Sequence, residues 1–188
     1  RAKIFSVGFN LSGRVNSKTG YSYSYFFVEE EPLTMLLEKR LGCKVYVEND
    51  ANAAAYGEYI AGGAKGYNDA VVITLGTGIG SGIILGGKIL RGFNFAAGEM
   101  GHNVIVKDGI QCTCGRRGCW ERYAATTALV RAAQEENPAW KDGRAIFAAA
   151  EAGNETVLAL LDHWTDEIAQ GLAGMVHIFN PQLILIGG

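Results

Sequence analysis

Three cysteines occupy one short segment of this sequence, CTCGRRGCWE (112–121). Their pattern is Cys112-x-Cys114-x4-Cys119, and His102 lies ten residues before the first of them. Zinc binds four thiolate or imidazole groups in a tetrahedron, and the glycines of the segment allow the chain to fold back and bring in the third sulfur. The spacing therefore favours a structural zinc site, in which four protein ligands leave no open position for catalysis.

Two other interpretations of these cysteines stay open. They are compatible with reduced, buried thiols, which pack as small apolar side chains. A disulfide would leave one of the three unpaired unless Cys43 took part, and the sequence carries no secretion signal, so a disulfide is less favoured. Cys43 itself lies between Gly42 and a strand-like run, and we expect it to be a core residue.

A glycine-rich stretch, LGTGIGSG (75–82), follows an apolar run. It lacks the third glycine of the dinucleotide-binding fingerprint and the lysine ending of a P-loop, and no helix is predicted directly after it. Backbone N–H groups at the tip of a glycine hairpin, together with the hydroxyl of Thr77, can cradle a phosphate without a lysine. The stretch predicts either a phosphate-binding turn at Gly76, Thr77 and Gly78 or a plain tight hairpin.

Asn49 and Asp50 lie where a predicted strand meets a predicted helix. Either residue can simply cap that helix. The same position also holds a carboxylate at the end of a strand, where it can take a proton from a substrate hydroxyl. Asp50 is therefore a candidate general base as well as a candidate cap.

Two further acids flank the cysteine cluster. Glu99 lies three residues before His102, and Glu121 lies two residues after Cys119. A metal held by the cluster would therefore orient both carboxylates together with the imidazole, and such a set suits a ligand that offers several hydroxyl groups. Each acid taken alone is equally compatible with a solvated surface position.

The elements that must position these residues alternate between strands and helices. A strand–turn–strand–turn–strand meander is predicted over 69–92. Single strands are predicted over 3–9, 43–47, 102–109 and 181–187. Helices are predicted over 32–42, 49–63, 120–136, 142–152 and 155–178. This alternation in blocks indicates the α/β or α+β class.

Composition excludes several classes of function. The 188 residues are 48% hydrophobic and carry a net charge of −2, which predicts a sizeable core and no basic footprint for nucleic acid or acidic membranes. The sequence contains neither a membrane-spanning apolar run nor a signal peptide, so we expect a cytoplasmic protein without a membrane partner. The sequence begins inside a strand-like run and ends on the turn after a buried strand, which predicts a piece of a longer protein.

Five segments, in this order along the chain, resemble the ROK family of bacterial glucokinase-like sugar kinases and sugar-responsive repressors. They are VENDANAAAYGE (47–58), LGTGIGSGIILGGKILRG (75–92), AGEMGH (97–102), CTCGRRGCWE (112–121) and FNPQLILIGG (179–188). The resemblance implies the actin/hexokinase-like ATPase fold, present here in part. Residues 1–66 would belong to the end of the N-terminal small α/β lobe, and 67–188 would form most of the large α/β lobe with its zinc-binding loop.

The same resemblance implies a role for each motif residue. Asp50 would be the general base that activates a sugar hydroxyl. The implied sugar contacts are Asn49, Asp50, Glu99, His102 and Glu121. The implied ligands of a structural zinc ion are His102, Cys112, Cys114 and Cys119. The implied nucleotide contacts are Gly76, Thr77, Gly78, Gly187 and Gly188.

Two functions of different classes follow from the resemblance. The first is transfer of the γ-phosphoryl group of Mg-ATP to a hexose such as glucose or to an N-acyl-hexosamine, by a homodimer. The second is a sugar-responsive transcriptional repressor, with a helix-turn-helix DNA-binding domain outside this chain. The pair Asn49-Asp50 and the turn Gly76–Gly78 favour the kinase, because a sugar sensor needs neither a base nor a nucleotide turn. A zinc-stabilised domain without any ligand is the least favoured interpretation.

The sequence departs from the family pattern at three places. The family's DxGGT-type phosphate turn is not in this chain, so we do not expect the chain by itself to turn over ATP. A turn that usually reads Pro-Gly in the family reads Leu11-Ser12-Gly13 here. The tyrosine- and serine-rich stretch that follows is also unlike the kinases, and it predicts an edge strand or a loop.

Overall fold

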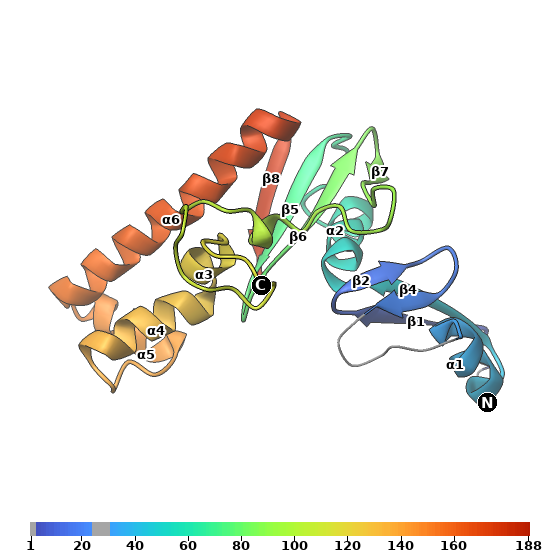
Figure 1. The fold of residues 1–188 in the computed structure, drawn as a ribbon, viewed down its shortest axis with the longest axis horizontal. Helices are drawn as coiled ribbons and strands as arrows, with labels where there is room; N and C mark the ends of the chain where they lie inside the picture. The colour runs from blue at the N-terminus through green and yellow to red at the C-terminus, as the bar shows by residue number, and fades with distance from the viewer. Residues whose placement is uncertain (1–2, 24–30) are drawn as a thin grey trace. The chain divides into compact units, whose positions relative to one another are not determined.

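The computed structural model describes residues 3–23 and 31–188 as a mixed α/β protein (Figure 1). The chain is divided between two compact units. The first comprises the described residues up to Val72 together with Gly82–Gly98, and the second comprises Ile73–Ser81 and Glu99–Gly188. The predicted α/β composition is therefore confirmed, while the predicted lobes, 1–66 and 67–188, stay a prediction.

The first unit is built on two short pairs of strands. β1 (Ser6–Leu11) and β4 (Lys44–Asn49) pair in parallel, whereas β2 (Arg14–Asn16) and β3 (Tyr21–Tyr23) pair antiparallel. The core between them consists of buried valines with apolar residues packed around them: Val15, Val45, Val47, Phe9, Leu11, Leu33 and Leu37. The register of β1 and β4 is the functionally important feature, because it pairs Leu11 with Asn49 and so sets Ser12 beside the end of β4.

Two helices of the first unit begin and end as the sequence predicts. α1 (Leu33–Leu41) ends where Gly42 adopts the left-handed conformation, with φ of 67°. α2 (Asp50–Ala61) begins directly after β4, and its N-cap is Asn49. The predicted tyrosine-rich edge strand is β3 up to Tyr23, and the part of that stretch beyond it lies outside the described residues.

The glycine-rich half of the chain forms a four-stranded sheet. Its members are β5 (Ala70–Leu75), β6 (Ile79–Leu85), β7 (Lys88–Ile89) and β8 (Leu183–Gly187), in the order β7-β6-β5-β8. The first three strands are neighbours in chain order, as the predicted meander over 69–92 requires. β8 joins beside β5, so the end of the chain lies next to the strand that precedes the glycine turn.

The helices of the second unit pack on one another. They are α3 (Glu121–Ala124), α4 (Thr126–Glu136), α5 (Gly143–Glu151) and α6 (Glu155–Phe179). Figure 1 shows α4 and α5 beside the first half of α6. Their shared core consists of Leu129, Ala133, Ile146 and Val157, with two tryptophans, Trp140 and Trp164, packed against it.

Two predictions of secondary structure were wrong. The predicted strand over 102–109 is instead a 3-10 turn, η1 (Met100–His102), followed by an irregular loop. The backbone N–H groups of Ile105 and Val106 both donate to the carbonyl oxygen of Gly118, so this segment is bonded to the cysteine loop rather than to a strand. Its alternating valines suggested a strand, but they are partly exposed.

The predicted helix over 120–136 is interrupted at Ala125, whose ψ of 155° is extended. The backbone N–H of Thr126 donates to the carbonyl oxygen of Gly76 at 3.1 Å instead of continuing the helix. A contact distant in sequence therefore divides the stretch into α3 and α4, which sequence periodicity does not reveal.

Trp120 anchors the cysteine loop in the core of the second unit. Its side chain is fully buried, and its indole N–H donates to the carbonyl oxygen of Glu167 on α6 at 2.8 Å. The indole lies against Gly171, where a Cβ atom would come within 2.1 Å of the ring. Trp120 is therefore a core residue whose position requires a glycine on α6.

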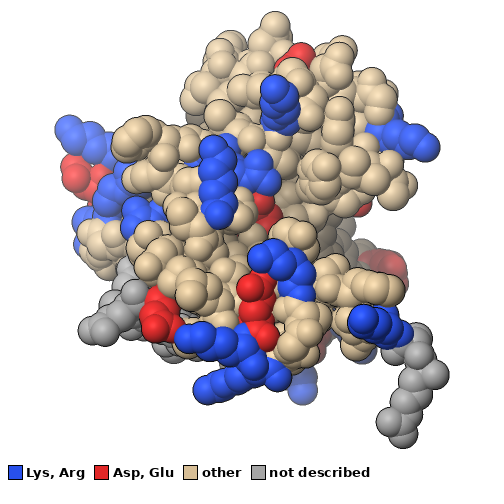
Figure 2. Space-filling model, turned by 90° about the vertical axis from the view of Figure 1, so that its right-hand side faces the viewer, with Lys and Arg blue, Asp and Glu red and all other residues tan. Residues whose placement is uncertain are grey.

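The charged surface carries both signs. On the face drawn in Figure 2, the blue basic and red acidic side chains are interspersed. Within the described ranges, no helix combines the length and the apolar character needed to cross a bilayer.

Candidate functional site

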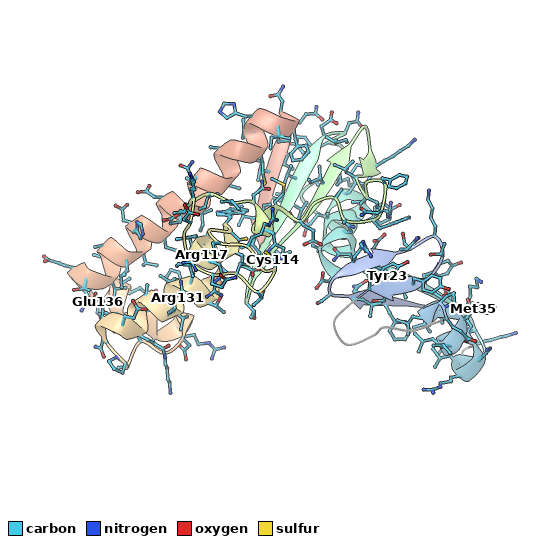
Figure 3. All side chains as sticks on the ribbon, in the orientation of Figure 1. Tyr23, Met35, Cys114, Arg117, Arg131 and Glu136 are labelled. Atoms are coloured by element: carbon cyan, nitrogen blue, oxygen red, sulfur yellow. The ribbon has the colours of Figure 1, made fainter. Side chains whose placement is uncertain are left out.

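The four predicted metal ligands lie together in the second unit. One ligand atom from each of His102, Cys112, Cys114 and Cys119 lies within 4.8 Å of the others. Nδ1 of His102 is 3.6 Å from the sulfur of Cys112, and the sulfurs of Cys114 and Cys119 are 3.5 Å apart. A tetrahedral zinc ion with bonds of about 2.0–2.3 Å separates its ligand atoms by about 3.3–3.8 Å, so these distances fit zinc. Figure 3 labels Cys114 in this loop.

The disulfide interpretation does not fit the same geometry. All four cysteines of the chain are free thiols. The sulfurs of Cys114 and Cys119, at 3.5 Å, are well beyond the bonded distance of about 2.05 Å. Cys43 lies outside the cluster and is half-buried.

Local turns bring the three sulfurs to one place. The backbone N–H of Cys112 donates to the carbonyl oxygen of Arg116 at 2.8 Å. The backbone N–H of Gly115 donates to the carbonyl oxygen of Cys112 at 3.1 Å. Gly118 has a φ of 82°, and a Cβ atom there would come within 1.7 Å of the carbonyl oxygen of Val106. The loop can therefore close only with glycine at position 118.

The two neighbouring thiols of the cluster differ in acidity. The backbone N–H of Arg116, hydrogen-bonded to the sulfur, lowers the pKa of Cys114 to about 6. Burial raises the pKa of Cys119 to about 12, and the adjacent cysteines raise it further by disfavouring a second negative charge. A bound divalent cation would lower the pKa of Cys119 again, because it stabilises every thiolate that it binds. The cluster thus has the chemistry of a cation site.

The orientation of His102 separates its two ring nitrogens. Nδ1 lies beside Cys112, so it is the nitrogen placed to complete a metal site. Nε2 is then left as the nitrogen that the ring offers to another group. Glu99 directly precedes η1, in the segment that carries His102.

Asn49 links three pieces of backbone in the first unit. Its side-chain oxygen, Oδ1, accepts from the backbone N–H of Asn52 at 2.9 Å, which caps α2. Its amide nitrogen donates to the carbonyl oxygen of Gly13 at 3.0 Å. The predicted capping role of Asn49 is therefore confirmed, and the residue also holds the turn after β1.

Asp50 presents an exposed and well-oriented carboxylate. Oδ1 accepts from the backbone N–H of Ala51 at 2.9 Å and from the side chain of Asn49 at 3.2 Å. Oδ2 accepts from the hydroxyl of Ser12 at 2.8 Å. Oδ2 keeps a lone pair for a further donor, so Asp50 is positioned to accept a proton from a ligand hydroxyl.

Sequence reasoning missed the residues that hold this end of β4. Arg91 donates to Oε2 of Glu48 from both Nε, at 2.9 Å, and Nη2, at 2.5 Å. Oε1 of Glu48 accepts from the backbone N–H of Asn49 at 3.0 Å. The contact between Ser12 and Asp50 was missed as well, because only the parallel register of β1 and β4 brings these two residues together.

Glu121 lies against the glycine turn of the second unit. Its Oε2 accepts from the backbone N–H of Ile79 at 3.0 Å. A Cβ atom on Gly78 would come within 2.3 Å of the same oxygen, so glycine is needed there for the carboxylate to approach. Gly78 therefore serves the approach of Glu121, a role that the sequence did not predict.

A cavity of about 540 Å³ lies beside the glycine turn, within the second unit. Its lining includes Gly76, Thr77 and Gly188, three of the five predicted nucleotide contacts. The lining also includes α4 residues that sequence reasoning missed: Thr126, Thr127, Val130, Arg131 and Gln134. Figure 3 shows Arg131 on α4. The cavity therefore joins two motifs that lie more than one hundred residues apart in the sequence.

The predicted site residues fall into two groups. Asn49 and Asp50 belong to the first unit, whereas Glu99, His102 and Glu121 belong to the second. The predicted nucleotide and metal residues all lie in the second unit. A common sugar pocket that draws on both units stays a prediction.

The chain has extensive similarity to known proteins. A model of the ROK family matches residues 1–188. A glucokinase of Streptomyces coelicolor is 38% identical over 205 residues, which cover 99% of this chain and 65% of that protein. A xylose repressor of Bacillus spizizenii is 36% identical over 156 residues, which cover 82% of this chain and 40% of the repressor.

A solved structure gives the same result for the fold. A ROK family glucokinase from Streptomyces griseus, in complex with glucose and AMPPNP, matches with a TM-score of 0.86 and 36% sequence identity. The match covers 99% of this chain and 66% of that one. The predicted fold is thereby confirmed as one that solved ROK structures share, and the chain spans about two thirds of their length.

Proposed function

Because this chain belongs to the ROK family, we propose that the whole protein is an ATP-dependent sugar kinase. It transfers the γ-phosphoryl group of Mg-ATP to a hydroxyl of a hexose such as glucose, or of an N-acyl-hexosamine. The observation that carries the proposal is the cavity beside the glycine turn. A protein that only sensed sugar would not need a nucleotide cavity.

The cavity has the size and chemistry for a nucleotide. Its volume of about 540 Å³ lies within the range of about 300–1,000 Å³ that is typical of small-molecule sites. The glycine turn offers backbone N–H groups, the N-terminus of α4 adds its dipole, and Arg131 adds a full positive charge. These groups suit the phosphates of ATP, whereas the apolar side chains of Leu75 and Val130 suit a base.

The proposed reaction is a single in-line displacement. A sugar hydroxyl oxygen bonds to the γ-phosphorus as the bond from that phosphorus to the β–γ bridging oxygen breaks, and ADP leaves. The hydroxyl proton passes to the carboxylate of Asp50. Asn49, Glu99, His102 and Glu121 bind and orient the sugar.

We propose zinc as the ion held by His102 and the three cysteines. Bound there, it would cross-link the loop 102–119 and take no part in the transfer, because all four of its positions are filled by the protein. Mg²⁺ enters the reaction with ATP and neutralises phosphate charge.

The same proposal extends to the organisation of the protein. Residues 1–66 belong to a small lobe and 67–188 to a large lobe, and closure of the lobes excludes water, which would otherwise compete as acceptor. The protein works as a homodimer in the cytoplasm, where its phosphoryl donor, ATP, is found.

A sugar-responsive repressor is the second candidate. The specific observation that favours it is the 36% identity to a xylose repressor. Such a protein would bind DNA through a helix-turn-helix domain outside this chain and would keep the sugar residues without needing the nucleotide cavity. Nucleotide binding therefore separates the two candidates.

The test is calorimetric titration of the whole protein with AMPPNP. We expect one site per chain and a roughly tenfold weaker Kd in Arg131→Ala, because a charged hydrogen bond to phosphate is worth about 1.5–3 kcal/mol. Arg144→Ala, which alters an exposed arginine on α5, is the matched control and should bind as the wild type does. Absence of AMPPNP binding by the wild type would reject the kinase and leave the repressor.

A further inference from the structure

The glycine turn is fastened to the segment that follows the cysteine loop. The backbone N–H of Thr126 donates to the carbonyl oxygen of Gly76 at 3.1 Å. The hydroxyl of Thr127 donates to the carbonyl oxygen of Thr77 at 2.8 Å. Both bonds use carbonyl groups of the turn, so they do not occupy its N–H groups; of these, the N–H of Gly76 donates within the turn to the carbonyl oxygen of Gly78 at 3.0 Å.

Glu121 makes the third attachment, and it differs in kind. Its charged Oε2 accepts from the backbone N–H of Ile79, which directly follows the turn, at 3.0 Å. Hydrogen bonds to a carboxylate are roughly twice as strong as neutral ones. The carboxylate also fills the space that a side chain at position 78 would occupy. Glu121 therefore fixes where the turn ends and β6 begins.

The two carboxylate oxygens of Glu121 have different environments. Oε2 is taken by the backbone of Ile79, which orients the whole group. Oε1 lies farther from Gly78, at 3.8 Å from the position of a Cβ atom there, against 2.3 Å for Oε2. Glu121 thus contacts the end of the phosphate turn through one oxygen, and the proposed function also makes it a sugar contact.

We propose that Glu121 couples the sugar site to the nucleotide site. Its Oε2 holds the phosphate turn while its Oε1 accepts a sugar hydroxyl, so each ligand orders the carboxylate for the other. Sugar and nucleotide then raise each other's affinity, and linkage requires the two factors to be equal. This inference rests on the proposed kinase function, and it adds a positioning role to a residue otherwise assigned only to sugar.

Three substitutions separate the two roles of the side chain. Glu121→Ala removes both contacts. Glu121→Gln keeps an oxygen that can accept from Ile79, but it presents an NH₂ group rather than an acceptor to the sugar. Thr127→Val removes a neighbouring attachment of the turn without touching the carboxylate.

The test is the Kd of AMPPNP for the whole protein, measured by calorimetry without sugar, with saturating glucose and with saturating N-acetylglucosamine. In the wild type we expect at least one sugar to tighten AMPPNP binding about fivefold or more. In Glu121→Ala, AMPPNP should bind several-fold more weakly, and the sugar should no longer affect it. Glu121→Gln should bind AMPPNP nearly as the wild type does and show a weaker sugar effect, because a neutral amide bonds a hydroxyl more weakly than a carboxylate does. Thr127→Val should bind AMPPNP more weakly and keep the sugar effect.

Metal content and thermal unfolding of each variant check that the loop and the fold are intact. Equal sugar enhancement in the wild type and Glu121→Gln would overturn the inference, as would unchanged AMPPNP affinity in a folded Glu121→Ala. A wild type that binds both ligands independently would overturn it too, while leaving the kinase proposal in place. A wild type that binds no AMPPNP, or neither sugar, would contradict the proposed function and this inference with it.

Discussion

We expect the substitution Asp50→Asn to abolish the proposed sugar phosphorylation by the whole protein and to leave sugar binding nearly unchanged. The expected loss in kcat is about 10²–10⁴-fold, the usual contribution of a positioned general base. An amide of the same shape cannot take the hydroxyl proton, but it can keep the local hydrogen bonds. Its oxygen can accept from the backbone N–H of Ala51, and its NH₂ group can donate to the hydroxyl of Ser12.

Steady-state kinetics and calorimetric titration with the sugar together measure this effect. Asp162→Asn, which alters an exposed carboxylate on α6, is the matched control and should retain wild-type kcat. A kcat within about tenfold of the wild type for Asp50→Asn would show that another group accepts the proton. A large rise in the sugar Kd with little change in kcat would make Asp50 a binding residue only.

We expect removal of the proposed zinc ion from the cysteine cluster to lower stability and sugar affinity together. Structural zinc contributes about 10–16 kcal/mol of apparent binding free energy in small zinc-dependent peptides. Loss of even a few kcal/mol lowers the Tm of a domain of this size by about 10 °C. The loop that would lose its cross-link carries His102 and ends beside Glu121, so the sugar contacts would become disordered with it.

Chelation followed by thermal unfolding and by sugar titration checks this result, with zinc content measured on the same samples. Cys119→Ser should reproduce the effect of chelation, because Cys119 is a fully buried ligand. Cys43→Ser, outside the cluster, should retain both zinc and sugar binding. Unchanged sugar affinity after complete loss of zinc would show that the cluster does not hold the sugar contacts in place.

Local chemistry explains what the sequence could predict. The clustering of the three cysteines was predictable because short spacings and glycine turns bring three sulfurs together within one loop. The start of α2 was predictable because Asn49 caps it through an oxygen that bonds three residues along the chain. The meander over 69–92 was predictable because glycine pairs separate its apolar runs.

Long-range contacts explain what it could not predict. The helix breaks at Ala125 because Thr126 bonds to Gly76, fifty residues earlier in the chain. The segment after His102 is not a strand because its N–H groups bond to Gly118. The role of Arg131 in the cavity depends on where α4 lies in the fold, and periodicity carries no information about that.

Turnover across a panel of hexoses and N-acyl-hexosamines measures most directly whether the whole protein phosphorylates a sugar with ATP. We expect equal amounts of ADP and sugar phosphate with at least one member of the panel, dependent on Mg²⁺ and lost in Asp50→Asn. No phosphorylation of any sugar by a folded, zinc-loaded protein would contradict the claim.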